Sequence, residues 1–163
     1  MARLPRLNKV VQFAVSIIIP LLAGFIGSLF TRMSVSTWYE TLQKPAFSPP
    51  NELFAPVWTI LYILMGLALY LVWSKNEGPQ EKKQALSAFA IQLLLNILWS
   101  AVFFGLRSPL GGLIVIWLLW VAIVYTIISF YRISELAAYL LIPYLLWVTF
   151  ALILNLAIWR MNA

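Results

Sequence analysis

The side chains best suited to bind a small molecule are aromatic rings and amides that recur at helical spacing in three apolar segments. Residues three or four positions apart share one face of a helix, so each group would point to one side. Rings combined with amides can hold a flat, mostly apolar molecule and fix its orientation. The three groups are Gln92, Asn96, Trp99 and Phe103; Pro143, Trp147, Ala151 and Asn155; and Trp58, Tyr62 and Gly66.

Two interpretations of these faces stay open. Inside a membrane, Asn and Gln also join helices by hydrogen bonds, and small residues allow helices to approach closely. For Asn96 and Asn155 this packing role explains the pattern as well as ligand binding does. For Trp58 and Trp147 the sequence favours a cavity, because the chain has eight tryptophans, more than the belts at two membrane interfaces require.

The chemistry that the chain lacks narrows the choice of function. It contains no histidine and no cysteine, which excludes disulfides, thiolate chemistry, His-ligated metals and acid–base catalysis by histidine. We expect no metal site and no cofactor. The apolar segments contain no Asp, Glu, Lys or Arg, which argues against proton-driven and ion-driven pumps, whereas a passive carrier stays open.

Composition identifies the setting of these residues as a membrane. Of the 163 residues, 63% are hydrophobic and 10% are charged, whereas a soluble domain has roughly 25% charged residues. Segments of this length can cross a bilayer only as helices, since lipid offers the backbone no hydrogen-bond partners. The sequence therefore predicts an all-α membrane protein, a bundle of five transmembrane helices in a single domain over residues 1–163. The predicted spans are 10–30, 53–73, 85–106, 110–130 and 136–158.

The basic residues predict an orientation in the membrane. With five spans, seven of the eleven Lys and Arg residues fall on the side that holds the N-terminus. Cytoplasmic loops carry the excess of basic residues, so the N-terminus is predicted to be cytoplasmic. The net charge of +6 suits anionic lipid, and we expect no nucleic-acid partner.

The segment 38–50 between the first two spans predicts a shaped loop. Prolines fix φ and remove backbone donors, and the loop contains Pro45, Pro49 and Pro50. Thr37 and Glu40 fit a capping box for a short helix. One interpretation is a lid over whatever the helices enclose; the other is an interfacial helix with its rings at headgroup level.

Taken together, these motifs resemble the translocator protein family (TspO/MBR, the peripheral-type benzodiazepine receptor), and the resemblance runs from the first span to Arg160. In the first half it is carried by Trp38-Tyr39, Lys44-Pro45, Pro49-Pro50, Pro56-Val57-Trp58-Thr59, Leu61-Tyr62, Met65-Gly66 and Tyr70 to Trp73. In the second half it is carried by Gln92, Leu95-Asn96, Trp99, Phe103-Phe104-Gly105, Arg107-Ser108, Pro143-Tyr144, Trp147, Leu154-Asn155 and Trp159-Arg160.

The resemblance implies a five-helix bundle that forms a homodimer, with a cavity near the long first loop. Its implied ligands are porphyrins such as protoporphyrin IX, other tetrapyrroles, and similar flat apolar molecules. The loop from Lys44-Pro45 to Pro49-Pro50 would cover the cavity. Some bacterial relatives degrade protoporphyrin in light, and the resemblance assigns that catalysis to Trp58 and Trp147. The implied ligand-binding residues are Tyr39, Pro49, Trp58, Asn96, Trp99, Phe103, Trp147 and Ala151.

Two positions depart from the family pattern. Phe47 stands where the family often has a tryptophan, and Leu156 stands where the sterol-recognition segment has a tyrosine. The second departure puts cholesterol binding in doubt and favours a microbial cell membrane as the location. Lys44 and Arg32 could pair with the propionates of a porphyrin, although attraction to anionic lipid explains these charges equally well.

Three functions therefore stand side by side. The first is a membrane receptor or sensor for porphyrins, acting in tetrapyrrole or stress regulation. The second is light- and oxygen-dependent degradation of porphyrin. The third is passive transport of porphyrin-like or sterol-like molecules.

Overall fold

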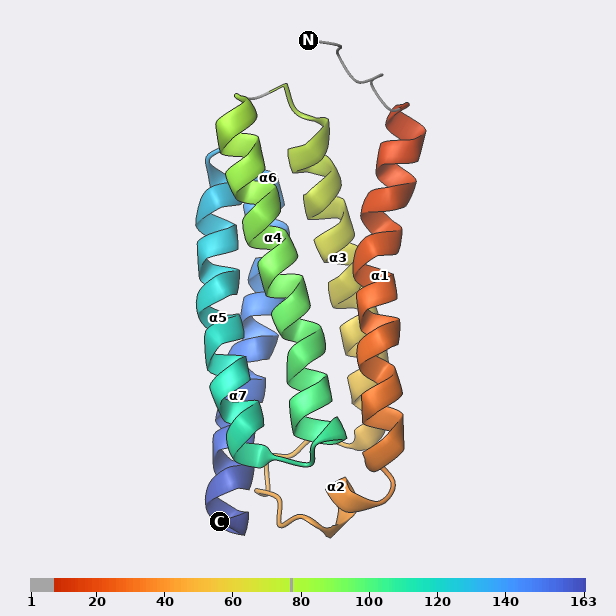
Figure 1. The fold of residues 1–163 in the computed structure, drawn as a ribbon, viewed down its shortest axis with the longest axis vertical. Helices are drawn as coiled ribbons and strands as arrows, with labels where there is room; N and C mark the ends of the chain where they lie inside the picture. Colours follow the sequence, from red (N-terminus) through yellow and green to blue (C-terminus); the bar gives the residue numbers. More distant parts are fainter. Residues whose placement is uncertain (1–7, 77) are drawn as a thin grey trace.

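The computed structural model describes residues 8–76 and 78–163. Within these two ranges the only regular elements are helices, as predicted (Figure 1). They are α1 (Lys9–Ser34), α2 (Trp38–Thr41), η1 (Asn51–Leu53), α3 (Phe54–Ser74), α4 (Pro79–Ser100), η2 (Ala101–Gly105), α5 (Pro109–Tyr131), α6 (Glu135–Leu140) and α7 (Ile142–Asn162).

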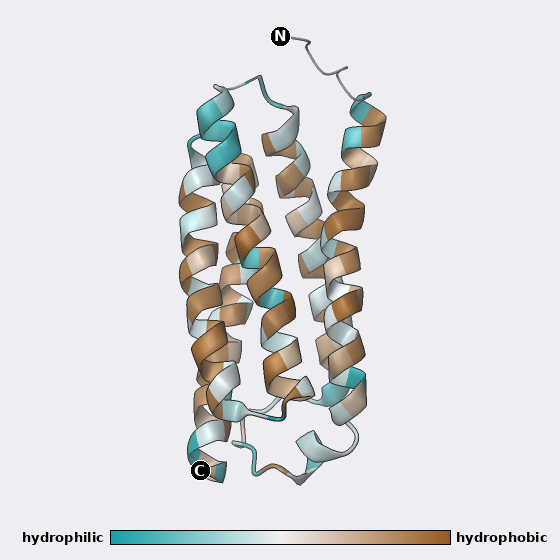
Figure 2. Cartoon of the chain, viewed as in Figure 1, coloured by the Kyte–Doolittle hydropathy of each residue, from teal (hydrophilic) through white to brown (hydrophobic). Residues whose placement is uncertain are grey.

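Five helical stretches in the described part are long and apolar enough to span a membrane, which confirms the predicted five-helix bundle. They are Lys9–Ser34, Asn51–Ser74, Pro79–Gly105, Pro109–Tyr131 and Glu135–Asn162. Hydrophobic residues predominate in the middle of the stretches, although hydrophilic bands interrupt α4, and hydrophilic residues gather at the two ends of the bundle (Figure 2). Each predicted span matches one stretch. The helices continue past most of the predicted limits, because polar residues at their ends stay helical, whereas the third stretch ends at Gly105, one residue before its predicted limit.

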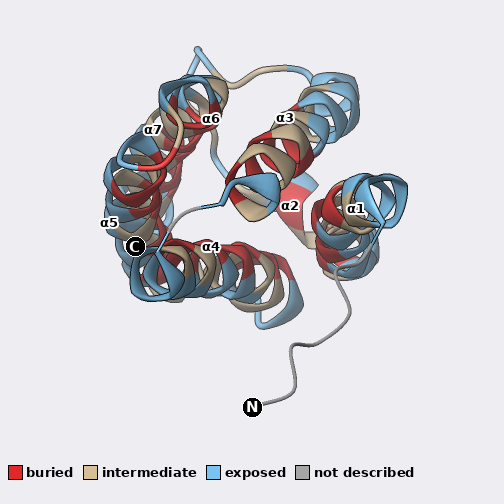
Figure 3. Ribbon diagram, turned by 90° about the horizontal axis from the view of Figure 1, so that it is seen from above, coloured by how far each residue is buried: buried red, intermediate tan, exposed pale blue. Residues whose placement is uncertain are grey.

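The helices form a closed ring when the bundle is viewed along its axis. α1 packs against α3 and α4, α4 packs against α5, and α5 packs against both α6 and α7. α3 closes the ring, chiefly against α6. Buried residues line the inner faces, and α2 lies across the far end of the bundle (Figure 3). The loop between α1 and α3 therefore lies at the same end as the C-terminus.

Two glycines bring α1 and α3 into close contact. A Cβ atom on Gly66 would lie 2.8 Å from the Cα atom of Ile17, and a Cβ atom on Gly24 would lie 2.3 Å from the ring of Tyr62. These distances are shorter than non-bonded carbon atoms tolerate, so only glycine permits this approach. Below Gly24, toward the loop, the contact between α1 and α3 gives way to a cavity.

Two irregular turns, neither of them predicted, shape the helices around that cavity. Leu106 N–H donates to the carbonyl of Ala101, five residues back, so α4 ends in the single π-turn η2. Such π-turns often occur at functional sites. The last span is interrupted at Leu141, between α6 and α7. Pro143 explains the interruption, since it has no N–H with which to continue the ladder of α6.

The short helix after Thr37 is present, but the predicted capping box is wrong. Thr37 makes no side-chain cap bond to α2. Its hydroxyl instead donates to the carbonyls of Met33 and Ser34, both at 3.4 Å. These carbonyls end α1 and have no intrahelical partner, so they compete for the hydroxyl.

Candidate functional site

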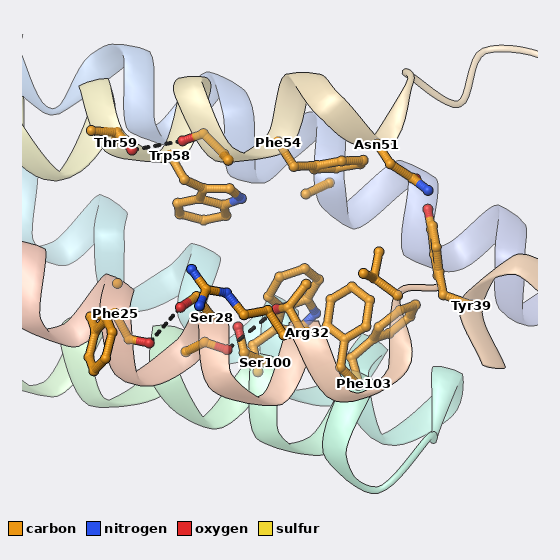
Figure 4. A pocket seen from close by; sticks show the side chains of 18 of the residues that line it. Phe25, Ser28, Arg32, Tyr39, Asn51, Phe54, Trp58, Thr59, Ser100 and Phe103 are labelled. Carbon is orange, nitrogen blue, oxygen red and sulfur yellow. Dashed lines mark hydrogen bonds between the residues drawn. The ribbon is translucent and has the colours of Figure 1, made fainter. Parts of the chain in front are cut away.

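A cavity of about 490 Å³ lies in the half of the bundle that faces α2. Its walls come from one face each of α1, α3 and α7, and from the junction of α4 with η2, so segments far apart in the sequence enclose it (Figure 4). This volume falls within the range of roughly 300–1,000 Å³ that is typical of small-molecule sites.

An aromatic wall, defined here as Trp58, Tyr62, Trp99 and Phe103, forms one side of the cavity. Trp58 lies nearly parallel to Tyr62, with ring centroids 5.5 Å apart and planes 26° apart. Trp58 and Trp99 are 6.4 Å apart at 32°, and Trp99 stacks on Phe103 at 5.7 Å and 27°. Rings from α3 and from α4–η2 thus offer a broad apolar surface on which a planar ligand can stack.

Asn155 holds this wall in place from α7. Its Oδ1 accepts from Trp99 Nε1 at 3.2 Å, and its Nδ2 donates to the carbonyl of Pro109 at 2.8 Å. Asn155 and Ala151 also line the cavity. Asn155 therefore joins three helices, as the packing interpretation predicted. It also lies at the cavity surface, where the ligand-binding interpretation placed it.

Asn96 lies behind the wall in a chain of buried hydrogen bonds. The Tyr62 hydroxyl donates to Asn96 Oδ1 at 2.7 Å, and Asn96 Nδ2 donates to the Tyr144 hydroxyl at 3.0 Å. The Tyr144 hydroxyl in turn donates to Gln92 Oε1 at 2.9 Å. Asn96 is not among the residues that line the cavity; it is linked to the cavity through the Tyr62 hydroxyl, and through Tyr144, whose ring packs against Trp58 at 6.2 Å.

Trp147 is also set back from the cavity. Its ring packs against Phe54, with centroids 6.1 Å apart, and against Phe150, at 5.4 Å. Phe54 lines the cavity and Trp147 does not. The indole Nε1 of Trp147 is buried and has no hydrogen-bond partner among the described residues.

The end of the cavity near the loop is closed by Tyr39 and by Asn51, which face each other in Figure 4. Tyr39 packs against Phe103 and Phe104 at centroid distances of 6.2 and 5.6 Å. Lys44 Nζ lies 4.4 Å from the centre of the Tyr39 ring, a cation–π contact. Burial raises the pKa of the Tyr39 phenol, so the phenol stays protonated and can donate a hydrogen bond.

The proline-rich segment 42–50 covers this end without lining the cavity. Pro49 is not a lining residue. Phe47 packs against Phe150 with centroids 6.3 Å apart, so its ring lies on α7 rather than in the cavity. Gln43 N–H donates to Asn162 Oδ1 at 2.9 Å, and Asn162 Nδ2 donates to the Gln43 carbonyl at 2.9 Å. These two bonds fasten the segment to the C-terminal end of α7.

Sequence reasoning missed the wall that α1 contributes. Gly24, Gly27 and Ser28 line the cavity, at spacings that place them on the same side of α1 as Arg32, which the sequence had already suggested as a partner for a propionate. Small residues carry no chemistry of their own, so the search for rings and amides passed over them. Their spacing was the available signal.

Of the predicted binding residues, the cavity brings together Tyr39, Trp58, Trp99, Phe103 and Ala151. Pro49, Asn96 and Trp147 lie outside its lining. Among the described residues, no three His, Cys, Asp or Glu side chains lie close enough to hold a metal ion. The described lining residues combine aromatic rings with small and polar side chains, and no Asp, Glu, His or Cys is among them.

Comparison with known proteins shows which family the chain resembles over nearly its whole length. The sequence model of the TspO/MBR family matches residues 16–160. The tryptophan-rich protein TspO of Chlorobaculum tepidum is 49% identical over 155 residues, 95% of this chain and 98% of the relative. The human translocator protein is 41% identical over 88% of this chain and 85% of its own length. The tryptophan-rich sensory protein of Cereibacter sphaeroides is 39% identical over 77% of each chain.

Proposed function

The chain belongs to the TspO/MBR family, and from that premise we propose that it is a membrane sensor that binds porphyrins and similar flat apolar molecules. The resemblance expected from the sequence is thereby confirmed at the level of the family. The name of the Cereibacter sphaeroides relative, a sensory protein, supports the sensor role. Protoporphyrin IX is the ligand that we propose as the first to test.

The observation that carries this proposal is the aromatic wall. Trp58, Trp99 and Phe103 present their rings at shallow mutual angles to a cavity of about 490 Å³. A planar ligand can stack on such a surface over a large area, and the polar groups at the margin can set its orientation. Asn155 fixes the Trp99 ring before any ligand arrives, and such preorganisation reduces the entropy cost of binding.

Titration with protoporphyrin IX tests the proposal through quenching of tryptophan fluorescence. We expect saturable quenching in the wild type and weaker binding in Trp99→Leu, which removes one ring of the wall. Trp117→Leu is the matched control, because Trp117 is exposed on α5 outside the cavity. Equal affinities in the two variants, or no saturable quenching in the wild type, would reject the proposal.

Degradation of porphyrin in light is a second candidate, favoured by the position of Trp58 in the cavity wall. An indole in contact with an excited porphyrin can pass it an electron, and molecular oxygen would be the final oxidant. The test is loss of porphyrin absorbance under light, in air and under argon. Loss in air at the wild-type rate in Trp58→Phe would reject this candidate.

The homodimer and the cytoplasmic N-terminus stay predictions. Light scattering of the purified protein tests the first. Labelling of a cysteine added next to Ala163 in intact cells tests the second, because five spans place the C-terminus on the outer side when the N-terminus is inside.

A further inference from the structure

The described residues place an opening of the cavity between α1 and α3. Its exposed lining residues are confined to α1 and to η1–α3, whereas those from α4, η2 and α7 are buried or half-buried. On α1 the exposed residues are Phe25 and Arg32, and on η1–α3 they are Asn51, Ala55 and Thr59. The opening begins directly below the contact of Gly24 with Tyr62.

This opening faces the bilayer over most of its height. Leu29 and Ile60 flank it and are 45% and 59% exposed, and both lie inside candidate membrane spans. Apolar side chains exposed at this depth contact lipid tails rather than water. A ligand that is dissolved in the bilayer can therefore enter sideways, without displacing segment 42–50.

Arg32 stands at this opening. Of the described residues that line the cavity it alone is charged, and none is acidic. Figure 4 shows its side chain extending along α1 toward Ser28, over the cavity. Among the residues that the structure describes, the guanidinium has neither an ion-pair partner nor a hydrogen-bond partner. The last turn of α1 favours a cation through the helix dipole, but the dipole does not account for a side chain directed over the cavity.

The other nearby cation is engaged elsewhere. Lys44 Nζ sits over the ring of Tyr39, and Lys44 does not line the cavity. The two charges that were interchangeable in the sequence are therefore distinguished by the structure. Only Arg32 is placed to meet an anionic group on a ligand in the cavity.

We propose that the cavity selects amphiphiles that carry a carboxylate, which enter from the bilayer between α1 and α3 and pair with Arg32. The ring system would lie on the aromatic wall, and the carboxylate would remain at the opening, where the guanidinium can meet it with two parallel N–H donors. The inference deepens the proposed function, since it names the chemical class that this same cavity prefers.

Paired ligands that differ only in charge test this selection. Protoporphyrin IX is compared with its dimethyl ester, and 1-pyrenebutyric acid with its methyl ester, in wild type and in Arg32→Gln. Comparing the two proteins for each ligand cancels the different partitioning of acids and esters into lipid. We expect Arg32→Gln to weaken binding of both acids about tenfold, as for loss of a charge-assisted pair, and to leave both esters within about twofold.

Two further variants serve as controls. Arg32→Lys should recover part of the affinity for the acids, because the charge returns without the planar fork. Lys44→Gln should leave the preference for acids unchanged. An equal loss of acids and esters in Arg32→Gln, or no loss at all, would overturn the inference, and so would failure of every ligand to bind.

The pyrene pair separates the inference from the proposed function. If neither porphyrin binds but pyrenebutyrate binds in an Arg32-dependent way, the porphyrin proposal fails and the selection for carboxylates stands. If the porphyrins bind and Arg32→Gln treats acid and ester alike, the reverse holds.

The sideways route has its own test. Thr59→Phe narrows the opening, and Ile60→Phe places the same ring on the neighbouring lipid-facing position. In vesicles preloaded with pyrenebutyrate we expect association to slow at least about threefold in Thr59→Phe alone, as for a more obstructed path. Equal association rates in the two variants would overturn the route.

Discussion

The two halves of the contact between α1 and α3 do opposite things with the same pair of helices. In the half away from the loop, Gly66 lets the backbones touch at Ile17, and no space remains between them. In the half near the loop, the ring of Trp58 occupies the interface side of α3, and a cavity of about 490 Å³ opens. The difference follows the residues on α3: glycine where the two backbones touch and tryptophan beside the cavity, in keeping with the close approach that small residues allow in membranes.

Polar groups follow the same division. In the packed half, buried hydrogen bonds run from Asn96 to the Tyr144 hydroxyl and from that hydroxyl to Gln92. In the open half, Arg32 and the face of Trp58 are directed into the cavity, where a ligand can meet them. Tyr62 stands at the border, since its ring lines the cavity and its hydroxyl donates to Asn96. Trp58 makes a second connection, since it lines the cavity and its ring packs against Tyr144.

A larger side chain at Gly66, where α1 and α3 touch, should have the largest effect on the free energy of unfolding. In Gly66→Leu the new side chain would meet the backbone of Ile17 and the carbonyl of Ser16, where a Cβ atom alone would already lie 2.8–2.9 Å from them. Backbone cannot move aside as a flexible side chain can, so we expect destabilisation of about 3 kcal/mol. The measurement is unfolding of the purified protein in mixed micelles, followed by circular dichroism.

The control for this variant lies on the same helix. Ile60 is exposed to lipid, so Ile60→Ala should change the free energy of unfolding by less than about 0.5 kcal/mol. If the free energy of unfolding of Gly66→Leu equalled that of the wild type, α1 and α3 would not be in close contact at this glycine. The contrast between the two halves would then be wrong.

The next largest effect is a difference in protoporphyrin affinity between variants of Trp58 and Trp147, the two tryptophans to which the sequence gave the same role. Trp58 lines the cavity, whereas Trp147 lies behind Phe54. We expect Trp58→Leu to weaken protoporphyrin binding by about tenfold or more, since it removes a stacking surface. Trp147→Leu should weaken it by about threefold at most, through a shift of Phe54. Equal losses in a binding titration would mean that the ligand reaches Trp147 directly, as the resemblance alone implied.

Periodicity made the architecture predictable, and it also made half of the site predictable. Apolar runs of membrane length leave few alternatives to five helices, and the spacing of Trp58 with Tyr62, or of Trp99 with Phe103, fixes a face. The π-turn η2 was not predictable, because it depends on how one helix ends against its neighbours. Pro143 was visible, but its spacing to Trp147 suggested a continuous face rather than an interruption.

The remaining errors concern competition between partners. Thr37 had a plausible acceptor role in α2, yet its hydroxyl donates to the end of α1. Helical spacing places Asn96 on the inner side of its helix. It does not say whether the amide contacts a ligand or a neighbouring helix. Sequence analysis treated Arg32 and Lys44 alike as partners for a propionate; the cation–π contact of Lys44 with Tyr39 and the place of Arg32 in the lining tell them apart.

A double-mutant cycle sharpens the border between the two halves. Asn96→Leu removes the acceptor of the Tyr62 hydroxyl, and Tyr62→Phe removes the hydroxyl itself. Each should cost about 1 kcal/mol of unfolding free energy, which is typical of hydrogen bonds within membranes. If Asn96 affects ligand binding only by holding Tyr62, the double variant should lose no more affinity than the larger single one. Additive losses of affinity would place Asn96 in direct contact with the ligand.

The smallest expected effect is on the release rate of the ligand when the hydrogen bonds between segment 42–50 and α7 are removed. Asn162 exchanges two hydrogen bonds with the backbone of Gln43 and donates a third to the carbonyl of Ile158. In Asn162→Leu the segment would stay attached to α7 only through its apolar contacts, such as Phe47 with Phe150.

Since the ligand is proposed to pass between α1 and α3, Asn162→Leu should speed release of protoporphyrin by no more than about threefold. That factor corresponds to less than 1 kcal/mol. Met161→Leu, at the neighbouring exposed position, is the control for a changed side chain at this end of α7. Stopped-flow displacement of bound protoporphyrin gives both rates. An increase beyond about tenfold in Asn162→Leu would make segment 42–50 the gate, and the opening between α1 and α3 would then be a window that the ligand does not use.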